Sequence, residues 1–171
     1  MRCSVMVGLA LTTIACLPDS LQTDQRARMI VNGANAFGEN VGFLEERPGF
    51  PRAAWRGPTG VIIDLGTLPG GSRSSAVAID ADGSIAGQSE TAGGAFHAVR
   101  WHHGIIEDLG TLPGGDFSVA SAIAGDAVLG ESTARDGTLH AFRWQGGTMT
   151  DLGRFSPSGS VAAPRIRADR R

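Results

Sequence analysis

Two histidines have the residue type and spacing that most resemble a repeated chemical site. His97 and His140 lie 43 residues apart, and each begins a His-Ala-x-Arg-Trp segment. Imidazole is a common metal ligand, so two such side chains converging on one axis would supply part of a metal site. No carboxylate or cysteine cluster accompanies them, and Pro51 stands at the matching position of the first copy. We therefore expect hydrogen-bonding roles at strand ends, and neither a metal nor another cofactor.

Three tryptophans, Trp55, Trp101 and Trp144, recur in the same pattern. A row of exposed indoles would stack on sugar rings and make this a carbohydrate-binding protein. Each tryptophan lies in an apolar run, however, and a large aromatic at such a position is more typical of the core between sheets. We expect core positions, and the glycan-binding alternative stays open.

Aspartates recur as well. Asp64, Asp108 and Asp151 each begin an Asp-Leu-Gly tripeptide. An aspartate at a strand end usually accepts the backbone N–H groups of the following turn. Asp80 and Asp82 resemble the opening of a calcium loop, but no glutamate follows at the required distance, which favours a hairpin turn. The chain also has no nucleophile elbow, P-loop or dinucleotide-binding motif, so we assign no catalytic residue and expect no enzyme.

Composition narrows the class of protein. The 171 residues carry a net charge of −2 and are 42% hydrophobic, which indicates a globular chain with no general attraction to nucleic acid. Glycine is abundant, at 25 residues, which indicates many tight turns. Cys3 and Cys16 are the two cysteines, so the remainder of the chain forms no disulfide.

The N-terminal segment is typical of an export signal. The apolar run over 3–17 is too short to span a membrane, and small residues precede Cys16 as they do at a cleavage site. We predict a signal peptide over 1–15, a linker over 16–26 and an extracellular or cell-envelope location. The segment before Cys16 also resembles a lipobox, so lipidation of Cys16 is an alternative to simple secretion. A buried element of a cytoplasmic protein, or a misplaced start codon, would explain the same apolar run.

The elements that position these residues form a repeat. The Asp-Leu-Gly tripeptides lie 44 and 43 residues apart. Gly42 precedes Trp55 by 13 residues, whereas the corresponding glycines of the later copies precede their tryptophans by 14. We predict a repeat domain over 27–166, with units of about 27–75, 76–119 and 120–162 and a partial unit over 163–171.

Each unit has the apolar alternation of β-strands rather than helices. In the middle unit it predicts strands over about 75–80, 84–89, 97–101 and 104–109, with His102 and His103 as a solvated turn. Pro69-Gly70 and Pro113-Gly114 predict type II turns. Four strands in 40–45 residues are typical of a β-propeller blade. We expect an all-β, propeller-like fold of about three four-stranded blades plus a stub, too few blades to close.

These motifs resemble the HAF family of bacterial extracellular repeats. His140-Ala141-Phe142 is the tripeptide that names the family, and the other hallmark, Asp-Leu-Gly-Thr-Leu-Pro-Gly-Gly, begins at Asp64 and at Asp108. The resemblance covers about 27–166 and implies exported proteins of undefined activity, with no site residues to carry over. The first unit departs from the pattern at 51–55 and the third at 154–158.

We therefore expect an exported, non-enzymatic β-repeat module that acts as an interaction scaffold for a protein or glycan partner. Two alternatives stay open: a carbohydrate-binding propeller fragment, and part of a propeller enzyme whose site lies outside this chain. Neither end of the array has the polar cap that terminal repeats need, so the open faces predict dimerisation, aggregation or further repeats encoded after Arg171.

Overall fold

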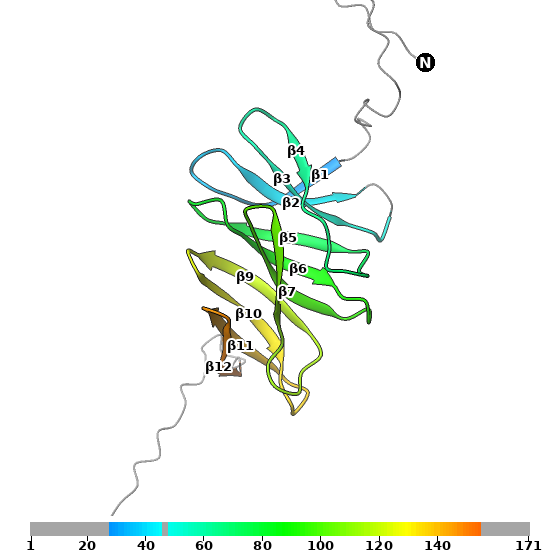
Figure 1. The fold of residues 1–171 in the computed structure, drawn as a ribbon, viewed down its shortest axis with the longest axis vertical. Helices are drawn as coiled ribbons and strands as arrows, with labels where there is room; N and C mark the ends of the chain where they lie inside the picture. Colours follow the sequence, from blue (N-terminus) through cyan, green and yellow to red (C-terminus); the bar gives the residue numbers. More distant parts are fainter. Residues whose placement is uncertain (1–27, 46–47, 155–171) are drawn as a thin grey trace, which may run out of the picture.

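The chain folds into stacked antiparallel sheets. A computed structural model describes residues 28–45 and 48–154, and within them it contains three four-stranded sheets and no helix (Figure 1). The all-β prediction is confirmed for these residues. The predicted signal peptide, the linker, Cys16 and the partial unit over 163–171 lie outside the described residues. In the part of the chain that is described, no helix is long and apolar enough to cross a membrane.

Each strand pairs with the next one along the chain. Sheet 1 contains β1 (Arg28–Ala34), β2 (Asn40–Glu45), β3 (Arg52–Arg56) and β4 (Ile62–Asp64). Sheet 2 contains β5 (Ser74–Ile79), β6 (Ile85–Glu90), β7 (Phe96–His102) and β8 (Ile105–Gly110). Sheet 3 contains β9 (Ser118–Ala124), β10 (Ala127–Thr133), β11 (Leu139–Gln145) and β12 (Thr148–Arg154). The strands of sheet 2 begin and end within one residue of the predicted bounds.

The connections between sheets use the predicted turns. Gly70 has φ +79°, and the Gly71 N–H donates to the Leu68 carbonyl at 3.0 Å, which is the geometry of a type II turn after Pro69. The next connection repeats it, with φ +81° at Gly114. The two connections between sheets therefore have the same turn geometry.

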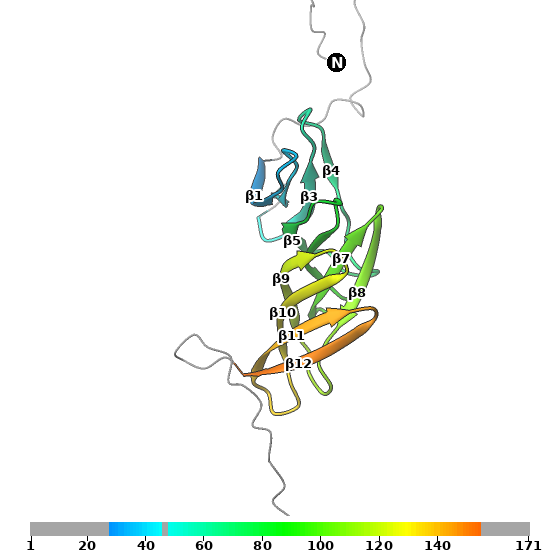
Figure 2. The same ribbon diagram turned by 90° about the vertical axis from the view of Figure 1, so that its left-hand side faces the viewer.

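The sheets stack along the long axis of the molecule (Figure 2). β5 packs on β1, β2 and β3, and β9 packs on β5, β6 and β7. Sheets 2 and 3 thus each have a docking face, which packs on the sheet before it, and sheets 1 and 2 each have a receiving face, on which the next sheet packs. We use the same two names for the equivalent faces of sheets 1 and 3. Two hydrophobic cores fill the interfaces, and Trp101 and Trp144 lie on the docking faces of sheets 2 and 3.

A bulge in the first strand of each sheet lies opposite a glycine. In sheet 2 the register of β5 shifts between Ala76 and Ala78, opposite Gly87. A Cβ on Gly87 would lie 2.1 Å from the Ser75 carbonyl oxygen, so no side chain fits there. Gly42 and Gly130 occupy the same position in the other sheets.

These glycines show that the sequence alignment of the first unit is displaced by one residue. Gly87 pairs with Val99, two residues before Trp101. Gly42 pairs with Ala54, one residue before Trp55. Successive side chains of a strand point to opposite faces, so a displacement of one residue changes the face.

Trp55 is therefore not the counterpart of Trp101. Its counterpart in sheet 2 is Arg100, and it lies on the receiving face of sheet 1, against the core shared with sheet 2. The residue that matches Trp101 is Arg56, and the residue that matches Ile85 is Asn40. At these two positions the docking face of sheet 1 consequently has polar residues where the later sheets have core residues.

Candidate functional site

The two candidate histidines pair with the aspartates of their own sheets. His97 Nδ1 lies 3.0 Å from both carboxylate oxygens of Asp108, and His140 Nδ1 lies 2.9 and 2.8 Å from those of Asp151. Each pair joins the start of the third strand to the end of the fourth. The predicted role of these histidines as hydrogen-bonding groups at strand ends is confirmed.

Sheet 1 has the same pair with an arginine in place of histidine. Arg52 Nε lies 3.2 Å from Asp64 Oδ2. The strand register shows that the residue of sheet 1 equivalent to His97 is Arg52 and not Pro51. Pro51 therefore does not interrupt the set, contrary to the sequence alignment. A base–aspartate pair therefore recurs in all three sheets.

The same aspartates hold the turn that follows. Each accepts the N–H of the glycine two residues later, at 2.8 Å for Gly66, 2.9 Å for Gly110 and 2.7 Å for Gly153. These bonds confirm the predicted role of the aspartates. Each carboxylate thus binds both a basic side chain of the third strand and a glycine N–H of the following turn. These contacts fix the edge of the sheet from which the chain continues to the next sheet.

His140 has a more crowded surrounding than His97. Its Nε2 is buried and makes no hydrogen bond among the described residues, and Asp136 Oδ1 lies 4.0 Å away. Asp136 is bound by Thr138 and forms an ion pair with Arg154, and these contacts hold the pKa of the Asp136 carboxyl far below its usual range. No group of three or more His, Cys, Asp or Glu side chains in the described ranges is placed to hold a metal ion.

The candidate tryptophans differ in accessibility. Trp101 is 2% and Trp144 4% exposed, so a sugar ring cannot reach their faces while the sheets stay packed. Trp101 Nε1 donates to the Leu65 carbonyl of the preceding sheet at 2.9 Å. The Arg100 guanidinium lies 4.8 Å from the Trp144 ring centroid, a cation–π contact across the next interface. Trp55 is half-buried.

Asp80 and Asp82 form the predicted hairpin turn. Asp80 Oδ1 accepts the N–H groups of Asp82 and Ser84, at 3.2 and 3.0 Å. Burial raises the pKa of Asp80, while a hydrogen bond with Asp80 lowers the pKa of Asp82 to about 2. Asp80 Oδ2 also accepts the Gly125 N–H of sheet 3 at 2.9 Å. The carboxylates therefore serve the turn and the stacking of sheets.

His102 corrects one prediction. It ends β7 rather than lying in a solvated turn, and its Nδ1 lies 2.6 Å from Oγ of the buried Ser84. His103 and Gly104 make the turn, both with positive φ.

Sequence reasoning missed the serines that join neighbouring sheets. Ser118 is fully buried; its Oγ accepts the Ala98 N–H at 2.7 Å and donates to the Gly110 carbonyl at 2.6 Å. Ser74 makes the same two bonds to sheet 1, at 2.8 and 2.7 Å. We call Ser74 and Ser118 the bridging serines. Their spacing of 44 residues equals the repeat period and was the available signal.

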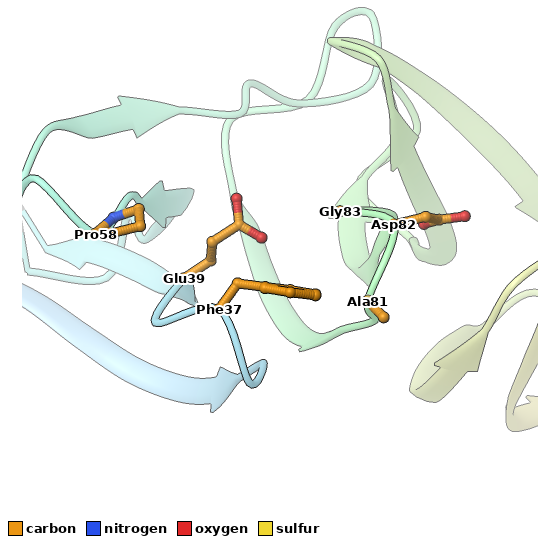
Figure 3. A pocket seen from close by; sticks show the side chains of 6 residues that line it. All are labelled: Phe37, Glu39, Pro58, Ala81, Asp82 and Gly83. Atoms are coloured by element: carbon orange, nitrogen blue, oxygen red, sulfur yellow. The ribbon is translucent and has the colours of Figure 1, made fainter.

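A shallow hollow of about 390 Å³ opens between the turns of sheets 1 and 2 (Figure 3). Its lining comes from the β1–β2, β3–β4 and β5–β6 turns: Phe37, Glu39, Pro58, Ala81, Asp82 and Gly83. Phe37 is 63% exposed, and its ring extends toward Ala81 of the neighbouring turn. The matching residue of sheet 2 is Asp82, so the fold itself does not require an aromatic at this turn.

Comparison with known proteins adds no relative: no protein-family model, curated protein or solved structure matches the chain.

Proposed function

We propose that this chain is an exported, non-enzymatic interaction module built from propeller-like repeats of the HAF type. The observation that supports it best is that the recurring polar side chains act in the scaffold. The base–aspartate pairs hold strand ends, and the bridging serines hold sheet junctions. Binding of a partner then falls to residues that the scaffold does not use.

Three exposed apolar residues stand out at the first and third turns. Phe37 is 63%, Val61 58% and Ile105 70% exposed. Val61 and Ile105 are equivalent residues, each three positions before the aspartate of an Asp-Leu-Gly tripeptide, whereas Phe37 has no apolar counterpart in sheet 2. In an antiparallel meander the first and third turns lie at the same end of the sheet, and the hollow joins these ends of sheets 1 and 2. We call this surface, formed by the first and third turns of sheets 1 and 2 with Phe37, Val61 and Ile105, the turn end. Apolar groups gathered at one end of a scaffold are typical of a protein-binding surface.

A photo-crosslinking experiment tests the turn end. A crosslinking phenylalanine analogue replaces Phe37 or Ile105 in producing cells, and Arg135, exposed in the β10–β11 loop at the opposite end, is the control position. We expect a discrete protein adduct from positions 37 and 105 that is absent from position 135. Adducts from all three positions, or from none, would contradict the proposal, and glycan-array binding without a protein adduct would favour the carbohydrate alternative.

Export has its own test. N-terminal sequencing of the protein recovered outside the cytoplasm should begin at Cys16 if residues 1–15 are removed as proposed. Globomycin-sensitive processing would assign lipidation to Cys16. An intact N-terminus on protein confined to the cytoplasm would contradict export and leave the turn-end proposal standing.

A further inference from the structure

The two interfaces between sheets show how a receiving face is used. On sheet 2, the Ala98 N–H and the Gly110 carbonyl bind the hydroxyl of Ser118, which is the first residue of β9. Ala86 and Ala98 are fully buried by sheet 3, and Arg100 lies over the Trp144 ring. The receiving face thus consists of small apolar residues, one arginine, and a backbone N–H and carbonyl that together bind a hydroxyl.

Sheet 3 carries the same groups on its own receiving face. Ala141 pairs with Gly153 at a register shift, as Ala98 pairs with Gly110. The two glycines have similar backbones, with φ +93° at Gly153 and +73° at Gly110. Among the residues that the structure describes, no serine binds the Ala141 N–H and the Gly153 carbonyl. The backbone geometry that binds a hydroxyl on sheet 2 is therefore present on sheet 3 without a bound serine among the described residues.

Two residues beside this position are exposed, whereas Ala141 itself is 7% exposed. Leu129 takes the place of the fully buried Ala86 and is 44% exposed. Arg143 takes the place of Arg100 and is exposed, whereas Arg100 is half-buried between the sheets. This face thus resembles the face of sheet 2 with its neighbour removed.

A second copy of the chain is a poor occupant. A head-to-tail copy would present the docking face of its sheet 1, where Arg56 replaces the tryptophan of later sheets. Arg56 would approach Arg143, and two like charges at an interface oppose association. The aromatic partner that Arg100 has in Trp144 would also be missing.

The sequence after sheet 3 supplies a better occupant. Ser160-Val161-Ala162 repeats Ser118-Val119-Ala120, and an isoleucine follows in both copies, five residues after Ser118 at Ile123 and six residues after Ser160 at Ile166. Ser118 lies ten residues after Asp108, and Ser160 lies nine residues after Asp151. We propose that residues 160–166 cover the receiving face of sheet 3 and that Ser160 Oγ binds the Ala141 N–H and the Gly153 carbonyl.

Amide hydrogen exchange of Ala141, followed by NMR in the full chain, tests this contact. Ser160→Ala removes the hydroxyl, and Ser158→Ala is the matched control, because it makes the same change two residues earlier. We expect Ser160→Ala to accelerate exchange at Ala141 about tenfold, as loss of one buried hydrogen bond does, and Ser158→Ala to leave it unchanged. A chain ending at Arg154 should behave as Ser160→Ala does.

Equal exchange rates in the four proteins would overturn the proposal. So would protection of Ala141 that rises with protein concentration together with a dimer in sedimentation, because a second copy would then cover the face. Acceleration by both serine substitutions would overturn it as well, since Ser160 would have no specific role. The outcome does not depend on whether the turn end binds a partner.

Discussion

The bridging serines make the strongest prediction about stability. Ser118→Ala leaves the Ala98 N–H and the Gly110 carbonyl without the hydroxyl that binds them at 2.7 and 2.6 Å, inside a fully buried interface. A buried polar group deprived of its partner costs about 1–3 kcal/mol. Two such groups, partly relieved by relaxation, give an expected loss of about 2–4 kcal/mol. That is a large share of the roughly 5–15 kcal/mol that stabilises a domain.

Urea denaturation followed by tryptophan fluorescence measures this loss, because Trp101 and Trp144 lie in the two interfaces. Ser121→Ala is the matched control. Ser121 lies in the same strand but is exposed, with one long bond of 3.3 Å to the Leu129 carbonyl, so its replacement should change stability by less than about 0.5 kcal/mol. Indistinguishable midpoints for the two variants would refute the assigned role of Ser118.

Three further predictions concern other contacts. Gly87→Ala forces a Cβ to within 2.1 Å of a carbonyl oxygen and should cost about 1–3 kcal/mol in denaturant melts, whereas Gly93→Ala, which meets only a threonine hydroxyl at 3.8 Å, should be nearly neutral. Arg100→Met removes two ion pairs and a cation–π contact and should cost about 1–2 kcal/mol, while exposed Arg143→Met should cost less than about 0.5 kcal/mol; equal losses would contradict the assigned contacts. Hydrogen bonds from Arg73 and Ser72 lower the pKa of Glu90 from 4.5 to about 2, so its contribution to stability is present above pH 4.5 and is lost as the pH falls toward 2. Thermal melts across that pH range should therefore show the gap between the wild type and Glu90→Gln closing as the pH falls, and a constant gap would count against it.

The repeat and its strands could be predicted from the sequence because their signals are local. Alternation of apolar residues gives the strand period, and a proline–glycine pair gives a turn whose dihedral angles those two residues already favour. The hairpin at Asp80 followed in the same way, since its hydrogen bonds run to residues two and four positions later.

The placement of Trp55 failed for a physical reason. Aligning it with Trp101 matched residue types, but the spacing from the paired glycine is 13 residues in one unit and 14 in the other. A difference of one residue reverses the face of a strand, so the shared tryptophan was the wrong anchor and the glycine opposite the bulge was the right one.

The bridging serines escaped sequence reasoning because their partners are backbone groups. Neither the Ala98 N–H nor the Gly110 carbonyl leaves a mark in the residue type, and a serine near a turn is common in any chain. Their importance comes from burial between two sheets, which only the stacking reveals.

Each junction is made by a serine of one unit and two backbone groups of the unit before it. The second unit supplies both kinds of partner, since Ser74 binds sheet 1 while its Ala98 N–H and Gly110 carbonyl bind Ser118. Tandem duplication of residues 74–117 would insert a whole sheet together with its two junctions, and no new contact would have to evolve. Such an array can lengthen or shorten in steps of about 44 residues. Duplicating the first unit would instead bury Arg56 in a core, so the repeats are interchangeable only after sheet 1.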